Sequence, residues 1–340
     1  MNKLKILLAG LVMLVSIGCA APVAPPARGD GATTSAPRLR IVATVSPITN
    51  VVYNIAGEHA EIVGIVPEGV NSHTYEPAPS DARRLAEADL IFINGLKLEE
   101  PTLKLAEANV KEGAEIVLLG DQTITPEQYV YDFSFPKEGG SPNPHLWPNP
   151  FLTLKYAEII RDKLMARDPA HADAYAANYA AFAKRIQALD EAIKATIASI
   201  PAQNRKLLTY HDSWAYFAPV YGMTVIGAIQ PSDFAEPSAQ EIVEIIEQLK
   251  AEQAPAIFGS EVFPSPVLEQ IARESGAAYV DDLRDDDLPG APGDVNHSYF
   301  GLMAENLRIM AEALGGDPSI MAAFDTRNVP GADSAVEQNQ

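Results

Sequence analysis

"PAHADAYAANYAAFAKRIQALDEAIKATIASI", residues 169–200, is the stretch that decides how the rest of the chain is organised. It is rich in alanine, its apolar residues recur at a helical spacing, and no proline or glycine interrupts it after Pro169. A helix of ~30 residues spans roughly 45 Å at about 1.5 Å per residue. Since that is longer than one small domain, we expect a helix that bridges two lobes.

Short apolar runs alternate with helical patterns on both sides of this helix. Strands are expected at 39–48, 61–67, 89–95 and 114–120 before it, and at 206–211, 223–229, 255–261 and 277–283 after it. Helices are expected between the strands, among them 81–88, 213–222, 238–253, 264–276 and 298–314. Such alternation favours parallel sheets. The expected fold is therefore α/β, with a first parallel-sheet lobe at 39–168, the bridging helix at 169–200 and a second lobe at 201–325.

The two ends of the chain have different compositions from the lobes. Lys3 and Lys5 precede an apolar run at 6–18 that is too short to span a bilayer, so residues 1–18 are expected to be a secretory signal peptide. Residues 19–38 are rich in Pro, Ala, Gly and Ser and are expected to form a flexible tether. The polar residues 326–340 are expected to be a disordered tail.

Cys19 is the single cysteine of the chain, and it stands directly after Gly18 in "SIGC". This stretch resembles a bacterial lipoprotein box, in which the signal peptide is cleaved and the thiol is lipidated. The resemblance implies a protein that is anchored by lipid to the outer face of the bacterial cell membrane. The alternative is an ordinary buried cysteine at the end of an apolar segment.

The net charge argues against a nucleic-acid-binding protein, and the cysteine content excludes a fold that is stabilised by internal disulfides. The net charge is −20, which argues against binding to nucleic acid and modestly favours cations near the surface. With one cysteine the fold cannot contain an internal disulfide, so its stability has to come from packing of the core. We expect a monomer.

Three histidines stand where a ligand site is expected. His73 lies in "NSHTYEPAPSD" (71–81), His145 lies in "NPHLWPNP" (143–150), and His211 follows the predicted strand "KLLTY". Asp281 ends the predicted strand "AAYV". Ligands bind beyond the carboxyl ends of strands in open α/β sheets, so we expect these side chains to meet in a cleft between the lobes. Three imidazoles and one carboxylate suit a divalent transition metal such as Zn²⁺. Each histidine taken alone is better explained as a surface or hydrogen-bonded structural residue than as a ligand, so the prediction of a metal site depends on the placement of all three.

Six motifs together resemble one family. They are "NSHTYEPAPSD", "NGLKLE" (94–99), "NPHLWPNP", "YHDSWAYFAPVYG" (210–222), "AEPSAQE" (235–241) and "VDDL" (280–283). In this order they are similar to the zinc/manganese group of ABC-transporter solute-binding lipoproteins. The resemblance implies two α/β lobes joined by a rigid helix, with a metal ion held between them. It implies His73 and His145 as ligands from the first lobe, and His211 and Asp281 as ligands from the second. It also implies a membrane permease as partner and no enzymatic activity.

The identity of the metal is an expectation drawn from the ligand types. Three nitrogen ligands and one carboxylate favour Zn²⁺ as the transported ion, whereas Mn²⁺ prefers more oxygen ligands. Mn²⁺ stays possible if Asp281 binds through both oxygens. Proton competition is expected near pH 6.5, because a protonated imidazole cannot bind metal. A surface-anchored zinc metallohydrolase is the rival function, since three histidines with an open position also describe a catalytic zinc site; an adhesin is a third possibility.

Further acidic residues are candidates for a supporting role around the metal. Asp212, Glu236 and Glu261 are second-shell candidates, since a carboxylate can fix the tautomer of a ligating imidazole. The run "DDLRDDD" (281–287) lacks the spacing of a calcium-binding loop. Beyond Asp281 we expect it to be a solvated acidic loop.

Overall fold

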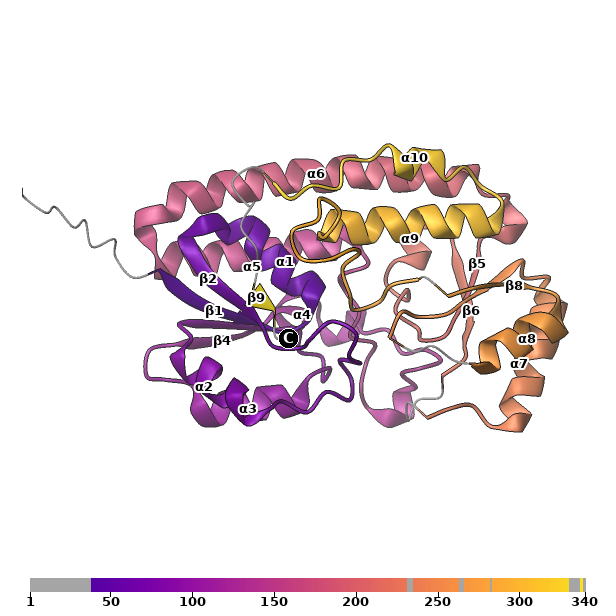
Figure 1. Ribbon diagram of the computed structural model, residues 1–340, viewed down its shortest axis with the longest axis horizontal. Coiled ribbons are helices and arrows are strands. Elements are labelled where there is room, and N and C mark those ends of the chain that lie inside the picture. Colours follow the sequence, from indigo (N-terminus) through magenta and orange to yellow (C-terminus); the bar gives the residue numbers. More distant parts are fainter. Residues whose placement is uncertain (1–37, 231–234, 263–265, 282, 330–336, 339–340) are drawn as a thin grey trace, which may run out of the picture. The chain divides into compact units, whose positions relative to one another are not determined.

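The strands predicted on the two sides of the long helix form two separate parallel sheets (Figure 1). The computed structural model describes residues 38–230, 235–262, 266–281, 283–329 and 337–338. The first sheet has the order β4-β3-β1-β2-β9, with β1 (Leu39–Ala43), β2 (Ala60–Gly64), β3 (Leu90–Ile93), β4 (Glu115–Leu118) and β9 (Glu337–Gln338). The second has the order β6-β5-β7-β8, with β5 (Lys206–Thr209), β6 (Thr224–Ala228), β7 (Ala256–Phe258) and β8 (Ala278–Val280). The neighbouring strands in both sheets pair in parallel, as the alternating pattern predicts.

The predicted bridging helix is confirmed. Helix α6 (Ala172–Ser199) has 28 residues and runs past both sheets, beside α5 (Pro150–Arg167) and α9 (Tyr299–Leu314) (Figure 1). The ring of Phe182 on α6 lies 5.2 Å from that of Phe300 on α9, between ring centroids. One buried apolar cluster includes Ile41 of β1, Ile193 of α6 and Leu207 of β5. Burial of each such side chain stabilises the fold by about 1.5–3 kcal/mol, and the shared cluster makes the two sheets parts of one core.

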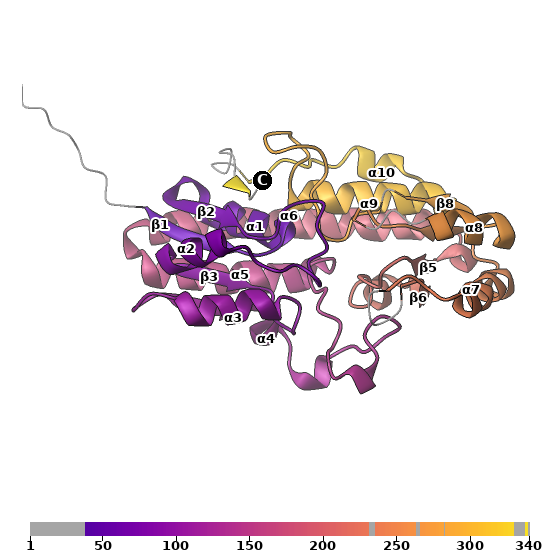
Figure 2. The same ribbon diagram turned by 60° about the horizontal axis from the view of Figure 1, so that its bottom comes forward.

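The other helices cover the remaining faces of the sheets (Figure 2). Apolar residues of α2 (Pro79–Glu87) and α3 (Glu100–Asn109) pack against one face of the first sheet. Those of α7 (Ala239–Glu252) and α8 (Pro266–Ser275) pack in the same way on the second sheet. The remaining helices are α1 (Ser46–Ala56) and the short α4 (Leu119–Thr123) and α10 (Ser319–Ala322), with 3₁₀ turns at 57–59, 126–128, 137–139, 169–171, 202–204 and 218–221.

Two local expectations differ from the structure. The first strand ends at Ala43, and the residues after it form α1, whose second residue is Pro47. Proline is well placed there because the first turn of a helix leaves its N–H groups unpaired in any case. The helix expected at 213–222 is only a 3₁₀ turn at Ala218–Tyr221, with Pro219 inside it. Pro219 lacks the N–H that a longer helix needs.

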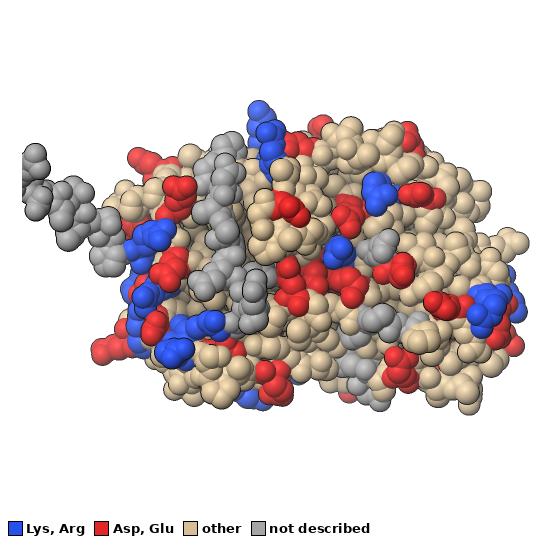
Figure 3. All heavy atoms as spheres, viewed as in Figure 1, with Lys and Arg blue, Asp and Glu red and all other residues tan. Residues whose placement is uncertain are grey.

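The signal peptide, most of the tether and Cys19 lie outside the described residues, and the boundaries of the two lobes stay predictions. In the predicted tail, the described residues are 326–329 and the strand β9, which pairs with β2. Val329 is buried and donates its backbone N–H to Asn54 Oδ1 at 2.9 Å. No helix in the described part of the chain combines the length and the hydrophobicity that crossing a membrane requires. Acidic side chains outnumber basic ones on the face shown in Figure 3, in line with the net charge of −20.

Candidate metal centre

Three histidines that are distant in the sequence meet through their Nε2 atoms. The Nε2 atom of His145 lies 3.1 Å from that of His73 and 3.3 Å from that of His211. A metal at about 2.0–2.1 Å from each nitrogen would place tetrahedral ligands about 3.3 Å apart. The two separations are thus close to those that a tetrahedral site requires. Among the described residues, no other group of three or more His, Cys, Asp or Glu residues places its ligand atoms within 4.8 Å of one another.

The loop after β2 presents His73. The backbone N–H of His73 donates to Asn71 Oδ1 at 2.9 Å, which closes a tight turn before the histidine. On the other side, Asp81 Oδ2 accepts from the Tyr75 hydroxyl at 2.9 Å and from the backbone N–H of Ala78 at 2.8 Å. Asp81 lies in the first turn of α2, so the helix start fixes the loop that carries the ligand. The unusual composition of this segment is therefore explained by the need to hold one imidazole in place.

Two asparagines position His145. Asn143 Oδ1 accepts from the backbone N–H of His145 at 2.8 Å and lies 2.9 Å from its Nδ1. The Nδ2 group of Asn94 donates to the carbonyl of Pro144 at 3.0 Å, and its Oδ1 accepts from the Tyr156 hydroxyl at 2.7 Å. An amide oxygen at Nδ1 selects the tautomer with the proton on Nδ1. The Nε2 atom of His145 consequently keeps a free lone pair for a metal.

His211 stands at the carboxyl end of β5. Its carbonyl accepts from the Thr209 hydroxyl at 2.7 Å, and its Nδ1 lies 3.2 Å from Gln230 Oε1. Gln230 follows β6, the strand next to β5, and its backbone N–H donates to the carbonyl of Tyr210 at 2.8 Å. The amide oxygen again places the proton on Nδ1, so a second Nε2 lone pair points into the site.

Burial keeps the three imidazoles neutral. His145 and His211 are buried and His73 is partly buried. Burial lowers the pKa of His211 to about 4, although the hydrogen bond with Gln230 raises it in part. Burial, followed by the charges of the neighbouring histidines, holds the pKa of His73 and His145 well below the usual value. Neutral imidazoles whose Nε2 atoms meet at 3.1 and 3.3 Å supply the nitrogen ligands that a divalent transition metal prefers.

Aromatic rings enclose the histidines. The Phe135 ring lies 5.5 Å from that of His73, 5.7 Å from that of His145 and 5.5 Å from that of His211, between centroids. Trp147 packs edge-on against His145 at 5.0 Å. Sequence reasoning did not identify Phe135, because nothing distinguishes it from the other aromatic residues of the proline-rich segment 121–150. These rings exclude water and strengthen electrostatic interactions at the site.

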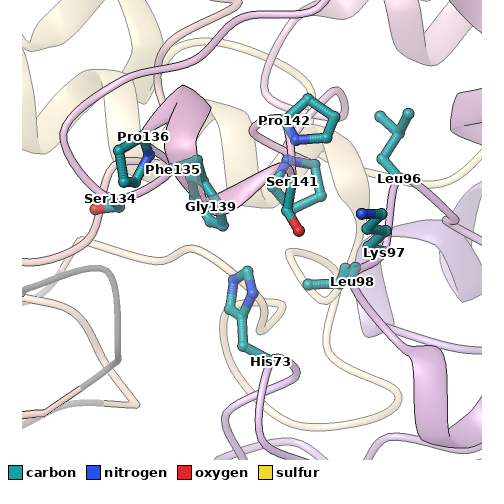
Figure 4. A pocket seen from close by; sticks show the side chains of 11 residues that line it. His73, Leu96, Lys97, Leu98, Ser134, Phe135, Pro136, Gly139, Ser141 and Pro142 are labelled. Atoms are coloured by element: carbon teal, nitrogen blue, oxygen red, sulfur yellow. The ribbon is translucent and has the colours of Figure 1, made fainter.

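A cavity of about 170 Å³ opens beside His73 (Figure 4). Its lining includes Lys97, Phe135 and Ser141 in addition to the imidazole of His73. On the rim, Leu96 and Lys97 both have positive φ, at 52° and 66°. Such backbone strain in residues with side chains is characteristic of functional sites.

Two of the acidic candidates lie at the surface. The side chain of Asp281 is exposed, and the residue is not among those whose ligand atoms converge. Its role as fourth ligand stays a prediction. Glu236 is also exposed, and its Oε1 lies 3.5 Å from the Tyr210 hydroxyl.

The two other candidates are enclosed by the fold. Asp212 is buried, and burial together with the charge of Asp132 raises its pKa to about 8. Its backbone carbonyl, rather than its carboxyl group, accepts the hydrogen bond from Asn143. Glu261 accepts hydrogen bonds from the backbone N–H groups of residues 285–287. Burial, and then the charges of Asp287 and Asp286, raise its pKa to about 7.

The expectation of a solvated acidic loop after Asp281 is wrong. Asp285, Asp286 and Asp287 are all buried, with exposed fractions of 5%, 5% and 8%. The physical reason is that each of their carboxyl groups accepts a hydrogen bond, from Ser213, Ser72 and Gly69, so that no carboxyl group is buried without a partner.

Comparison with protein families identifies the chain's relatives. One family model, described as "Zinc-uptake complex component A periplasmic", matches residues 41–313. The iron-binding protein YfeA of Yersinia pestis is 30% identical over 281 residues, which are 83% of this chain and 88% of that protein. The manganese-binding lipoprotein MntA of Halalkalibacterium halodurans is 28% identical over 304 residues, which are 89% of this chain and 96% of that protein.

Solved structures show the same fold. The periplasmic zinc binding protein TroA from Treponema pallidum superposes with a TM-score of 0.74 and 26% identity, over 82% of this chain and 99% of that one. A Mn-bound periplasmic metal binding protein from Candidatus Liberibacter asiaticus gives a TM-score of 0.72 and 25% identity, over 82% and 100% of the two chains.

Loss of the Asn143 side chain should weaken metal binding without removing a ligand. We expect Asn143→Ala to lower metal affinity by about 10–100-fold, because His145 loses the group that fixes its tautomer and ring orientation. Isothermal titration of the metal-free variant measures this. The control is Asn109→Ala, which removes an amide that bonds only within α3, to the carbonyl of Leu105. Equal affinities of the Asn143 variant and the wild type would contradict the assigned role.

The lowered histidine pKa values replace the expectation of proton competition near pH 6.5 with one of competition at lower pH. At pH values between about 6.5, the usual histidine pKa, and the lower histidine pKa values of the folded protein, the unfolded chain binds more protons than the folded one. The metal-free fold therefore loses stability from the histidines as pH falls through that window, while the imidazoles stay neutral and able to bind metal.

We accordingly expect metal affinity to change by less than about tenfold per pH unit between pH 6.5 and 5.5, and to fall steeply only at lower pH, where the histidines with lowered pKa values become protonated. Competition with a chelator of known pH dependence, measured across this range, tests the profile. A loss near pH 6.5 of about a thousandfold per unit, as three exposed imidazoles would give, speaks against buried neutral ligands.

Proposed function

The chain belongs to the family of periplasmic zinc-uptake component A proteins, which are metal-binding substrate-binding proteins of ABC transporters, and we propose that it captures a divalent transition-metal ion outside the cytoplasm and delivers it to a membrane permease. The observation that carries the proposal is the convergence of three neutral imidazoles through Nε2. The ion is cargo and not a catalyst. The family consists of solute-binding proteins without enzymatic activity, so the metallohydrolase alternative has no support.

Zn²⁺ is the proposed cargo. Relatives are named for manganese, iron and zinc, so membership of the family does not select one of these metals. The donor set does discriminate, because three imidazole nitrogens, two pairs of which lie 3.1 and 3.3 Å apart, suit Zn²⁺ better than Mn²⁺, which prefers oxygen ligands. Mn²⁺ is the alternative cargo, and it would require further oxygen donors.

Asp281 is the proposed source of the oxygen ligand. It follows β8 in the second sheet, and its backbone runs beside the end of β7, where Gly259 donates to the carbonyl of Val280. A Cβ atom at Gly259 would lie 3.2 Å from Asp281 Cα, so glycine lets the two strand ends approach closely. We propose that the exposed carboxylate of Asp281 turns toward the histidines when the ion binds, which neutralises part of its charge.

The cavity beside His73 is the proposed route of the ion. His145 and His211 are buried, whereas His73 is only partly buried and borders the cavity (Figure 4). An arriving ion would meet His73 first and would exchange its hydration water for the other two imidazoles afterwards.

Replacement of one imidazole should remove most of the affinity. We expect metal-free wild-type protein to bind about one Zn²⁺ per chain, and His211→Ala to bind at least about 100-fold more weakly, because two nitrogen ligands do not complete the site. Anaerobic competition between Zn²⁺ and Mn²⁺, followed by elemental analysis, gives the stoichiometry and the preference together. The matched control is His171→Ala, an exposed histidine that pairs with Asp168.

Full zinc occupancy of purified His211→Ala would contradict the assignment of the metal site. A clear preference of the wild type for Mn²⁺ would leave the site in place and overturn only the choice of metal.

Anchorage to the membrane is proposed through Cys19. The lipoprotein-like stretch "SIGC" and the lipoprotein relatives support lipidation at this residue, with residues 20–38 as the tether. In a bacterial host that processes lipoproteins, the wild-type protein should incorporate radiolabelled palmitate, whereas Cys19→Ala should not. Equal labelling of the Cys19→Ala variant would refute the lipid anchor.

A further inference from the structure

A buried acidic segment, residues 285–287, contacts the loop of every histidine in the metal centre. The indole N–H of Trp147, two residues after His145, donates to the carbonyl of Asp285 at 2.9 Å. The hydroxyl of Ser213, two residues after His211, donates to Asp285 Oδ1 at 2.5 Å. Since one residue accepts from both loops, a displacement of Asp285 acts on two ligands at once.

The remaining histidine is held by the next two residues of the segment. The backbone N–H of Ser72, directly before His73, donates to Asp286 Oδ2 at 3.3 Å. Three residues earlier, the backbone N–H of Gly69 donates to Asp287 Oδ2 at 2.7 Å. Residues 285–287, which follow the second sheet, thus form hydrogen bonds with the loop after β2 of the first sheet, which carries His73.

Glu261 determines the shape of the acidic segment. Its Oε1 accepts three consecutive backbone N–H groups, those of Asp285 at 2.9 Å, Asp286 at 3.1 Å and Asp287 at 3.0 Å. Its Oε2 also accepts from the N–H of Asp285, at 3.0 Å, and from the hydroxyl of Ser260 at 3.1 Å. Successive N–H groups that converge on one anion form a backbone nest, whose geometry depends on that anion.

The direction of these hydrogen bonds explains why a hydrogen-bond acceptor is needed at this place. Within residues 285–287 the backbone N–H groups point to Glu261, while the carboxylates point to the histidine loops. Without the Glu261 carboxylate, three buried N–H groups lose their acceptor, and the segment has to turn to find others. Any such turn redirects the carboxylates that hold Ser72, Ser213 and Gly69.

We propose that Glu261 is a positioning residue of the metal centre, which acts through residues 285–287 to hold the loops of His73, His145 and His211 at ligating distance. The inference rests on the proposed function, since it assigns to Glu261 a part in the affinity for the captured ion. The contacts form a defined series. The Glu261 carboxylate binds the backbone N–H groups of residues 285–287, these residues contact three loops, and each loop carries one of the three histidines.

A structural role in folding alone makes a different prediction. In that case Glu261 would stabilise the fold, and any variant with the same loss of stability would lose the same affinity. A positioning role requires that the affinity and the coordination geometry change beyond what the lost stability accounts for.

The experiment compares three variants of the mature chain. Glu261→Ala removes the anion, Glu261→Gln retains one acceptor oxygen, and Asp190→Ala is the matched control. Asp190 is a buried carboxylate on α6 that accepts from the Tyr221 hydroxyl at 3.0 Å and from Lys194 at 2.6 Å, and its partners carry no ligand. Thermal unfolding of each metal-free protein measures the lost stability. Zn²⁺ competition with a chromogenic chelator measures affinity, and the visible absorption of the Co²⁺-saturated protein reports coordination geometry.

We expect Glu261→Ala to weaken Zn²⁺ binding by about 10–100-fold and to change the intensity of the Co²⁺ absorption bands, as loss of an outer-shell partner does. Glu261→Gln should recover a large part of both. Asp190→Ala should keep the wild-type affinity within about twofold and the wild-type spectrum, even at an equal loss of melting temperature.

The proposal is overturned if Glu261→Ala retains the wild-type affinity and spectrum, or if Asp190→Ala loses as much affinity at equal loss of stability. If Glu261→Ala does not fold, Asp286→Ala and Ser213→Ala each remove one link, and wild-type affinity in both is equally decisive against it. Failure of the proposed function has a different signature, because the wild-type protein itself then binds neither Zn²⁺ nor Co²⁺.

Discussion

The structure depends on one electrostatic constraint, which is that three imidazole lone pairs have to converge at a place with little water. Nε2 lone pairs that face one another do not attract, so the fold must hold the imidazoles together until a cation arrives. Amide oxygens at Nδ1 of His145 and His211 favour the proton on Nδ1, so that Nε2 carries the lone pair. Burial keeps the pKa of all three histidines low, which preserves the lone pairs at mildly acidic pH.

The architecture meets this constraint by bringing loops of two sheets together. His73 and His211 follow parallel strands of different sheets, and the carboxyl ends of parallel strands are where side chains can leave the sheet without disturbing its hydrogen bonds. Helix α6 joins the two halves through a shared apolar core. On the side of the metal centre, residues 285–287 add a polar connection between the same halves. The apolar core around α6 and the hydrogen bonds of residues 285–287 would together keep the two halves in contact while they adjust to a bound ion.

Much of this arrangement is predictable from the sequence, and the exceptions share a physical cause. The long helix and the parallel strands are predictable because the spacing of apolar residues and the short apolar runs are local properties of the sequence. The three histidines are predictable as candidate ligands because they stand near predicted strand ends or in loops. Asn143, which bonds His145, lies two residues before it and could have been identified by that spacing. Phe135 and the buried residues 285–287 could not, because their positions depend on contacts with partners far away in the sequence. An acidic run is normally solvated, and only the carboxylate of Glu261 and the loops of the other half make its burial possible.

X-ray absorption at the zinc edge of the Zn²⁺-loaded protein tests the central claim most directly, because it counts imidazole ligands without any substitution. The account predicts a four-coordinate ion with three imidazole nitrogens and one oxygen at about 2.0–2.1 Å, and multiple scattering from three rings. A six-coordinate shell of oxygen atoms, or scattering from one imidazole or none, would contradict it.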